Sequence, residues 1–494
     1  MPAKNRIFIK KEKNAAANGT EAPAEIAGAS ATASALVPTI FVIFGITGDL
    51  AARKLLPALL SLYSKKMLPP RFAIIGFSRR PFGKQEFREL IRNRLNIRSG
   101  QFKEEDIKHF LDHISYEQGQ FDEAAAYRRL SVRIQGIDDA WGQCSNKLFH
   151  LSVPPSLYES ILANLAASNL TRPCDDLTGW TRVLIEKPFG NDIEHARLLD
   201  RLLGKLFKEE QIFRIDHYLA KETLRNILAF RFHNHLFEPI WNRHSIEKIH
   251  IKLFEKNGVI DRGDTYDTVG ALKDVGQNHI LMMLAAVAMD QPRVFSAKEV
   301  RRERARVLAK LCPAGHKSSN GCDIRGQYAD YRSEPGVAKD SKTETYFRLK
   351  AFVNSSRWKG VPFYLESGKA MYESRTEIDV YFKGGKGSAN QNIVTFKIQP
   401  DEGIKIKFFV KTPGAAFEVE PKTLKFRYSD VPADHWQNLP NDYERLISDA
   451  FVGDQTLFAS TDEIMASWKF IAAVLKYFSK LPLVTYSKGS KEIA

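Results

Sequence analysis

A cluster of reactive side chains lies in the middle of the chain, in the run Asp216-His217-Tyr218-Leu219-Ala220-Lys221. It holds a carboxylate, an imidazole, a phenol and an ammonium, of which two can transfer protons and three can bind a phosphate. Ile212, Phe213 and Ile215 before the cluster form an apolar lead-in, as in a strand, and the residues after it have helical spacing (Leu224, Ile227 and Leu228). The cluster is therefore predicted on a strand-to-helix loop, where α/β proteins bind ligands. The alternative interpretation is a polar loop that only caps the helix.

The elements that must hold this loop change character along the chain. In the first half, continuous apolar runs near residues 39, 72, 148, 183 and 212 predict a parallel sheet buried on both faces. In the second half, the candidate strands alternate apolar and polar residues, which predicts a sheet covered on one face (249–253, 377–381, 404–408 and 424–428). We expect an α/β amino-terminal Rossmann-like dinucleotide-binding domain at 38–214. A larger α+β domain with a mostly antiparallel sheet should follow at 215–494 and serve substrate binding and oligomerisation, and residues 1–37 should form a disordered tail.

A dinucleotide site is predicted at the end of the first strand. The two glycines of the run there permit a tight turn that brings a pyrophosphate to backbone amides at a helix amino terminus (Gly45, Ile46, Thr47, Gly48, Asp49 and Leu50). The second strand ends in Ser78-Arg79-Arg80, where an NAD enzyme typically carries an acid. Arg79 is therefore predicted to bind the 2′-phosphate of NADP, whereas Arg80 is interpreted as a surface residue.

Several motifs share one family resemblance. They are GITGDLA at 45–51, PPSLY at 154–158, EKPFG at 186–190, RIDHYLAKE at 214–222, DVGQNH at 274–279 and RWKGVPF at 357–363. With these motifs, the chain from about Phe41 to about Trp468 resembles the glucose-6-phosphate dehydrogenase family. It departs from the family at Ala220, where glycine is usual; the extra methyl would be neutral in helical backbone but would alter the loop if φ is positive.

The resemblance implies a reaction and its residues. The C1 hydroxyl of glucose 6-phosphate would be oxidised to 6-phosphogluconolactone with hydride transfer to NADP, the first step of the oxidative pentose phosphate pathway. His279, at the start of an apolar helix predicted at 275–289, would be the base, and Asp216 would orient it. Tyr158 would contact the cofactor, although core packing is an equal alternative. Substrate binding would fall to Lys187, which would also touch the cofactor, and to His217, Tyr218, Lys221, Glu255, Asp274, Lys369 and Gln399.

Further expectations concern partners. No metal is needed for hydride transfer to NADP with a histidine base. A homodimer or homotetramer is expected. Some family members bind a second, structural NADP through basic residues, but the matching positions here are Glu366, Arg375 and Lys397, and the acid would repel a phosphate.

Composition restricts the remaining classes of function. Lysine and arginine exceed aspartate and glutamate by 15, but the positive charges are scattered, and the cluster at 301–306 is interpreted as a solvated helix face rather than a nucleic-acid site. The four cysteines form no CxxC pair and are too few for a disulfide framework. We find no run of about 20 apolar residues and expect no membrane contact and a cytoplasmic protein. A nicotinamide oxidoreductase acting on another sugar, and a noncatalytic binding protein, remain as alternatives.

Overall fold

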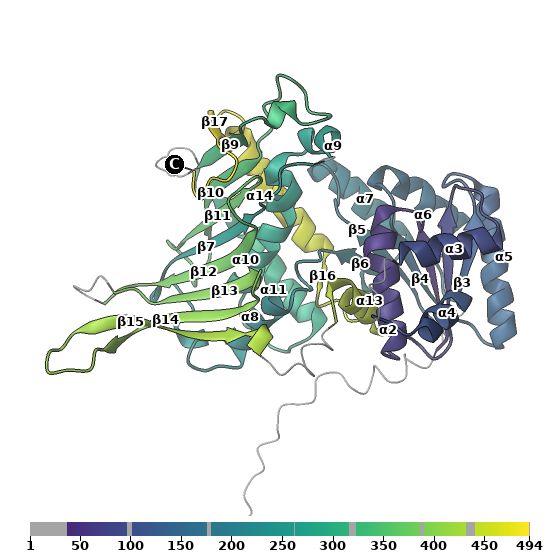
Figure 1. Cartoon of the computed structure of the whole chain (residues 1–494), viewed down its shortest axis with the longest axis horizontal. Coiled ribbons are helices and arrows are strands. Elements are labelled where there is room, and N and C mark those ends of the chain that lie inside the picture. Colours follow the sequence, from purple (N-terminus) through teal and green to yellow (C-terminus); the bar gives the residue numbers. More distant parts are fainter. Residues whose placement is uncertain are drawn as a thin grey trace, which may run out of the picture.

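Two sheets with helices between them make up the protein. The structure, a computed structural model, describes residues 37–95, 101–174, 179–260, 262–315, 323–385, 390–430 and 440–493. The predicted tail at 1–37 lies outside the described residues except for residue 37. Figure 1 shows the smaller sheet and its helices on the right, the larger sheet on the left, and helices α8, α10, α11 and α14 between them.

The smaller sheet is the predicted parallel one. Within the described residues it has the order β16-β6-β5-β4-β1-β2-β3, and only β16 runs antiparallel to its neighbour. Its strands are β1 Thr39–Phe44, β2 Phe72–Ser78, β3 Ile114–Gln118, β4 Asn146–Leu151, β5 Thr181–Glu186, β6 Ile212–Ile215 and β16 Phe458–Ala459. The connecting segments include η1 Ala51–Leu55, α2 Leu56–Ser64, α3 Lys84–Arg94, α4 Glu104–Asp112, α5 Ala124–Trp141, α6 Tyr158–Ala167 and α7 Ile193–Leu206. Every residue of β1 and β4 is buried, as the continuous apolar runs predict.

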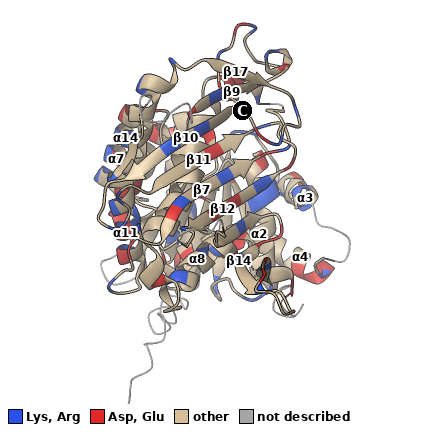
Figure 2. Ribbon diagram, turned by 90° about the vertical axis from the view of Figure 1, so that its left-hand side faces the viewer, with Lys and Arg blue, Asp and Glu red and all other residues tan. Residues whose placement is uncertain are grey.

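The larger sheet is mostly antiparallel. Its order in the described residues is β15-β14-β13-β12-β7-β11-β10-β9-β17, with β8 paired to β10, and only the β7–β11 and β9–β17 pairs are parallel. Its strands are β7 Ile246–Phe254, β8 Leu311–Pro313, β9 Ile324–Tyr328, β10 Tyr346–Val353, β11 Pro362–Gly368, β12 Arg375–Phe382, β13 Ile393–Gln399, β14 Gly403–Lys411, β15 Val419–Arg427 and β17 Leu483–Tyr486. Positively and negatively charged residues are interspersed along its strands (Figure 2).

The helices of the second half lie mainly against the other face. They include α8 Glu222–Phe232, α9 Gly263–Asp267, η5 Leu272–Ile280, α10 Leu281–Ala288, α11 Ala297–Ala309, α13 Asp442–Val452 and α14 Thr461–Phe478. The apolar helix predicted at 275–289 is thus divided into η5 and α10, and α10 is buried on all sides.

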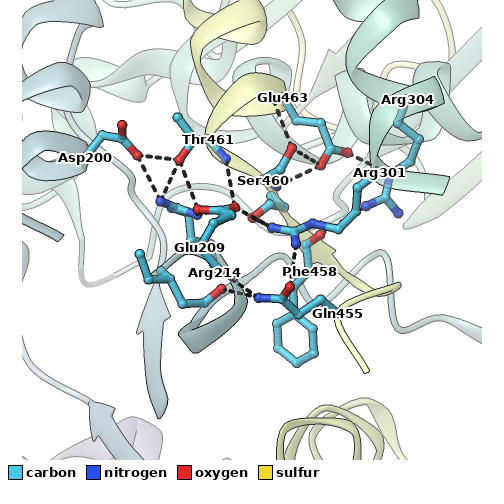
Figure 3. A network of polar contacts seen from close by, with 12 residues as sticks. Asp200, Glu209, Arg214, Arg301, Arg304, Gln455, Phe458, Ser460, Thr461 and Glu463 are labelled. Carbon is cyan, nitrogen blue, oxygen red and sulfur yellow. Dashed lines mark hydrogen bonds and ion pairs between the residues drawn. The ribbon is translucent and has the colours of Figure 1, made fainter. Parts of the chain in front are cut away.

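The basic cluster on α11 contradicts the prediction of a solvated face. Arg301 and Arg304 are 6% and 2% exposed, and only Arg302 and Arg306 face solvent. The two buried arginines are three residues apart and therefore lie on one side of α11, which packs against α14. Arg304 Nε donates to Glu463 Oε1 at 2.6 Å, within the polar network of Figure 3.

The same network holds the strand that leads to the predicted site. Arg214, on β6, is 3% exposed and pairs with Asp200 and Glu209 at 2.9 Å each. Arg301 also reaches Glu209, at 2.6 Å, so α7, α11 and β6 are joined by two buried arginines and their partly exposed carboxylate partners (Figure 3). Because buried ions need partners, this arrangement restrains the end of β6 immediately before Asp216.

Two cysteines are linked, although the sequence predicts no disulfide framework. Cys144 and Cys174 form a disulfide, whereas the Cys312 thiol is free and exposed. The two bonded residues precede the neighbouring strands β4 and β5, a pairing that only the fold reveals. The result is a single cross-link within the described residues. No helix of the described chain is long and apolar enough to cross a membrane.

Candidate active site

The two predicted catalytic residues meet in the interior. Asp216 follows the last residue of β6, and His279 lies near the end of η5. His279 Nδ1 is 2.6 Å from Asp216 Oδ1, and the side chains are 3% and 2% exposed. The backbone N–H of Tyr218 donates to the same Oδ1 at 3.0 Å. The ligand atoms of Asp216, His217 and His279 also lie within 4.8 Å of one another, but the 2.6 Å contact leaves no space for an ion between its two atoms.

The environment determines where the protons of this pair reside. Burial opposes ionisation of Asp216, but the adjacent His279 and its hydrogen bond, with His217 and Lys187, outweigh this effect and lower the pKa of Asp216 to about 2. Burial lowers the pKa of His279, and Asp216 opposes that shift only in part. At neutral pH the carboxylate therefore accepts the proton of Nδ1–H, and Nε2 of a neutral imidazole keeps its lone pair. This is the protonation state that a general base requires.

The unusual geometry of η5 places its functional groups. It is a π-helix, in which residues five apart are hydrogen-bonded and point to a similar side of the helix. Asp274 and His279 are five residues apart and so occupy one side, whereas 3.6 residues per turn would separate them. Asn278 Nδ2 donates to the Asp274 carbonyl at 3.0 Å and reinforces the turn.

Alternating ammonium and carboxylate groups lie beside the catalytic pair. Lys187 follows β5, and its Nζ donates to the Asp274 carbonyl at 3.1 Å. Lys369 follows β11, and its Nζ donates to Glu255 Oε2 at 2.5 Å and lies 3.8 Å from Asp274 Oδ2. Burial raises the pKa of Asp274, but Lys187, Lys369 and Arg262 outweigh it and lower the pKa. Ionised carboxylates accept hydrogen bonds and ammonium groups donate them, as a polyhydroxyl substrate requires.

The remaining predicted substrate residues lie on the loop after β6 and opposite it. Burial and the neighbouring His279 lower the pKa of His217 to about 3, so His217 is neutral at neutral pH. The Tyr218 hydroxyl accepts a hydrogen bond at 3.2 Å from Nε2 of Gln399, the last residue of β13. Lys221 Nζ lies 2.8 Å from Asp442 Oδ2 at the start of α13. The structure thus brings together all ten residues predicted to catalyse or bind substrate.

The backbone at Ala220 is not strained. Among the described residues other than glycine, positive φ occurs at Lys66, Asn169, Asp330, Ala370 and Asp401. Ala220 is therefore outside the left-handed region, and its methyl group is buried. The altered loop that a positive φ at Ala220 would cause therefore does not occur.

The glycine turn after β1 fits a dinucleotide. Gly45 has φ +79°, and a Cβ there would lie 2.3 Å from the Ser152 carbonyl oxygen, so the loop requires glycine to pack against the end of β4. Gly48 N–H donates to the Gly45 carbonyl at 2.8 Å, and Thr47 accepts a hydrogen bond from Arg94 at its carbonyl. The turn brings the chain from the carboxyl end of β1 to the start of η1, the position at which such folds bind pyrophosphate.

The other residues of the predicted cofactor site differ in their exposure to solvent. Arg79 is exposed at the end of β2, with its guanidinium 6.0 Å from the centre of the Phe121 ring. Asp49 is also exposed and pairs with Arg53 at 2.8 Å. Tyr158, in contrast, is 1% exposed, and its hydroxyl donates to the Glu186 carbonyl at 3.1 Å. The structure therefore supports the core interpretation of Tyr158, which anchors the strand end before Lys187 rather than presenting a free surface.

Glu366, which matches a ligand of the second NADP in some family members, is hydrogen-bonded to neighbouring side chains of this chain. Glu366 is 5% exposed and accepts hydrogen bonds from His250 Nε2 at 2.7 Å and from the Tyr346 hydroxyl. These two donors lower the pKa of Glu366 against the effect of burial, so the group is an anion. An anion at this place disfavours a phosphate.

Sequence reasoning assigned no role to three residues of α13 that contact the site. Asp442 pairs with Lys221, the Tyr443 hydroxyl donates to Glu186 Oε1 at 3.1 Å, and Arg445 Nη1 donates to the Ala220 carbonyl at 3.0 Å. Their motif is recognisable in the sequence, but it lies more than 200 residues from the loop that it contacts.

A dinucleotide-type parallel sheet, with an imidazole–carboxylate pair and lysines at the carboxyl ends of its strands, defines a nicotinamide-dependent oxidoreductase. Comparison with known proteins narrows this class. Residues 42–226 match the family model described as "Glucose-6-phosphate dehydrogenase, NAD binding domain", and residues 228–493 match "Glucose-6-phosphate dehydrogenase, C-terminal domain". The chain belongs to the glucose-6-phosphate dehydrogenase family.

Individual relatives agree over nearly the full length. The chain is 40% identical over 451 residues to a glucose-6-phosphate 1-dehydrogenase of Aggregatibacter actinomycetemcomitans, covering 88% of this chain and 90% of that protein. It is 38% identical over 484 residues to one of Chlamydia muridarum, covering 92% and 94%. A solved structure of a glucose-6-phosphate dehydrogenase in complex with its substrate glucose-6-phosphate superposes with a TM-score of 0.85 at 32% identity, covering 92% of this chain and 95% of that one.

Proposed function

We propose that this protein oxidises the C1 hydroxyl of glucose 6-phosphate to 6-phosphogluconolactone and transfers the hydride to NADP. The observation that carries the proposal is the buried contact of 2.6 Å between His279 Nδ1 and Asp216 Oδ1 at the carboxyl end of the parallel sheet. When bound, the nicotinamide supplies the hydride acceptor. The catalytic groups of this chain have only to bind and orient the sugar and to accept one proton.

The proton is assigned to His279. Its Nε2 would take the proton of the C1 hydroxyl as the hydride leaves, a contribution of about two to four powers of ten for a positioned base. Asp216 would stabilise the resulting imidazolium and fix the ring orientation through Nδ1–H. The neutral state of His279 at neutral pH, caused chiefly by burial, supports this role.

Binding of the sugar phosphate is divided between two sets of residues. We assign the 6-phosphate to His217, Tyr218 and Lys221, since Lys221 lies at the amino terminus of α8, where a cation and a helix dipole both favour an anion. The sugar hydroxyls are assigned to the ammonium and carboxylate groups beside the catalytic pair and to one amide (Lys187, Glu255, Asp274, Lys369 and Gln399).

NADP rather than NAD is proposed as the cofactor. Arg79 is an exposed cation at the end of β2, where the 2′-position of the adenosine ribose lies in this fold. The pyrophosphate would lie against the turn at Gly45, Ile46, Thr47, Gly48, Asp49 and Leu50, with Lys187 near the reactive end of the cofactor. Tyr158 would act only by supporting the strand that bears Lys187.

The wider setting follows from the reaction. We propose two domains, at 38–214 and 215–494. We also propose a cytoplasmic location, because glucose 6-phosphate and NADP are charged metabolites that do not cross membranes. The reaction would be the first step of the oxidative pentose phosphate pathway. We also propose a homodimer or homotetramer. Exposed apolar side chains on and beside β15, among them Phe417, Leu424 and Phe426, are 84%, 60% and 44% exposed and support self-association.

A substrate panel and one variant test the proposal. Wild-type protein should reduce NADP with glucose 6-phosphate far faster than with free glucose or galactose 6-phosphate. His279→Asn should lower kcat by at least about a hundredfold and leave KM for glucose 6-phosphate within about threefold. Preference for another sugar would replace the proposed substrate. Unchanged turnover in the variant would remove His279 from its assigned role.

A further inference from the structure

The first turn of α13 contacts the loop that bears the proposed phosphate ligands. Asp442 Oδ2 lies 2.8 Å from Lys221 Nζ, with side chains 27% and 17% exposed. Three residues along, Arg445 Nη1 donates to the Ala220 carbonyl at 3.0 Å, and Nη2 lies 2.5 Å from Glu222 Oε2. One helical turn thus contacts the Lys221 ammonium, the backbone carbonyl of the residue before Lys221 and the side-chain carboxylate of the residue after it.

Arg445 itself is fixed. Its side chain is 8% exposed, and its guanidinium plane can bond a carbonyl and a carboxylate simultaneously, which an ammonium does poorly. The helix turn is also anchored: the Asn441 side chain caps α13 by accepting from the amides of Tyr443 and Glu444. Glu444 Oε2 in turn pairs with Lys65 Nζ at 2.7 Å, at the end of α2. The contacts to the loop therefore come from a rigid element.

The loop needs such support from outside. Its internal hydrogen bonds are Leu219 N–H to the Asp216 carbonyl, Lys221 N–H to the Tyr218 carbonyl and Tyr218 N–H to Asp216 Oδ1, each at 3.0 Å. None of these bonds involves the Ala220 carbonyl. The hydrogen bond from Arg445 fixes this carbonyl, and the ion pair of Arg445 with Glu222 adds a contact at the first residue of α8.

We propose that Arg445 is a positioning residue that presets the phosphate-binding loop, so that affinity for the phosphorylated substrate depends on it while the hydride-transfer geometry does not. This inference rests on the proposed function, since it assumes that Lys221 binds the 6-phosphate. Arg445 acts through the loop: it holds Lys221 in place before substrate arrives, which reduces the ordering that binding would otherwise require.

The test compares two arginines that both approach Glu222. Arg445→Met removes the contact to the Ala220 carbonyl. Arg225→Met serves as the matched control, because Arg225 is half exposed and lies 3.8 Å from the same carboxylate. We expect Arg445→Met to raise KM for glucose 6-phosphate at least tenfold, with kcat within threefold and kcat/KM for free glucose within twofold. Arg225→Met should change none of these more than twofold.

Two further variants separate positioning from a general loss of structure. Arg445→Lys retains the charge but not both bonds, and its KM should lie between those of wild type and Arg445→Met; it also provides the test if the methionine variant does not fold. In a Lys221→Ala background, Arg445→Met should raise KM less than threefold, because the group that it positions is gone.

The outcomes are distinct. Equal losses with glucose 6-phosphate and free glucose, an unchanged KM in Arg445→Met, or a full additional tenfold effect in the Lys221→Ala background would each overturn the assignment of Arg445. Wild-type protein that reduces no NADP with glucose 6-phosphate would overturn the proposed function itself and, with it, this inference.

Discussion

Replacing Asp216 by asparagine isolates the electrostatic contribution of the catalytic pair. Asparagine has almost the same shape, so the fold around it should persist, but it has no charge to stabilise an imidazolium. The pKa of Asp216 is about 2, against an ordinary value of 3.8. A difference of this size corresponds to about 2 kcal/mol by which the surroundings favour the carboxylate, even after the cost of burial.

This magnitude gives an expected rate. If the positive charge that forms on His279 recovers an interaction of about 2 kcal/mol, Asp216→Asn should lower kcat by about 30-fold or more. KM for glucose 6-phosphate should stay within about threefold, since Asp216 is buried beneath the imidazole and is assigned no contact with substrate.

The pH dependence provides a second readout with a definite sign. Burial and Lys187 lower the pKa of His279, whereas Asp216 raises it. In the wild type, kcat/KM should therefore fall on the acid side with a midpoint below about 6.5. Removing the carboxylate lowers the pKa of His279 further and should shift this acid limb to lower pH.

The assay is the initial rate of nicotinamide reduction at saturating NADP, measured from about pH 4.5 to 9. Asp340→Asn, a change at an exposed aspartate, serves as the control and should match the wild type. A kcat for Asp216→Asn within threefold of wild type, or an acid limb shifted to higher pH, would refute the assignment of Asp216 as the group that orients and stabilises His279.

Three further changes test other parts of the account. Lys221→Ala should raise KM for glucose 6-phosphate far more than KM for free glucose; equal losses would reject the phosphate assignment. Arg79→Ser should reduce the ratio of kcat/KM with NADP to that with NAD by at least tenfold, and an unchanged ratio would assign the 2′-phosphate to another residue. Arg304→Met leaves the fully buried Glu463 carboxylate without its cation and should lower the free energy of unfolding by about 3–5 kcal/mol, measured in urea. An unchanged urea midpoint would show that this ion pair contributes nothing.

The parallel sheet could be predicted because its sequence pattern is local. The run at 40–44 is apolar throughout, and the structure buries all six residues of β1. The alternating runs at 249–253 and 377–381 likewise correspond to strands β7 and β12. Burial alternates along β7, as strand periodicity predicts, whereas the polar Glu377 and Asp379 of β12 are buried as well and pair with Lys252.

Contacts between distant segments could not be predicted in this way. Arg301 and Arg304 suggest a solvated face because the sequence gives no sign of Glu463, the buried partner of Arg304, 159 residues away. Cys144 and Cys174 are joined only because β4 and β5 are neighbours.

The catalytic site shows the same limit. Asp216 stands out through its local motif, but its partner His279 is 63 residues away and was identified by family resemblance, not by spacing. Neither the local sequence pattern nor the family resemblance predicts a role for Arg445. Its contact with the Ala220 carbonyl depends on how α13 packs beneath the loop, which is a property of tertiary structure.

The most direct test of the central claim is the absorbance of reduced nicotinamide when purified, folded protein is mixed with glucose 6-phosphate, with NADP and NAD in separate cuvettes. Rapid reduction with NADP and much slower reduction with NAD is the predicted result, and it would support the substrate, the cofactor and the role of Arg79 together. Reduction with neither cofactor would contradict the proposal that this site oxidises glucose 6-phosphate.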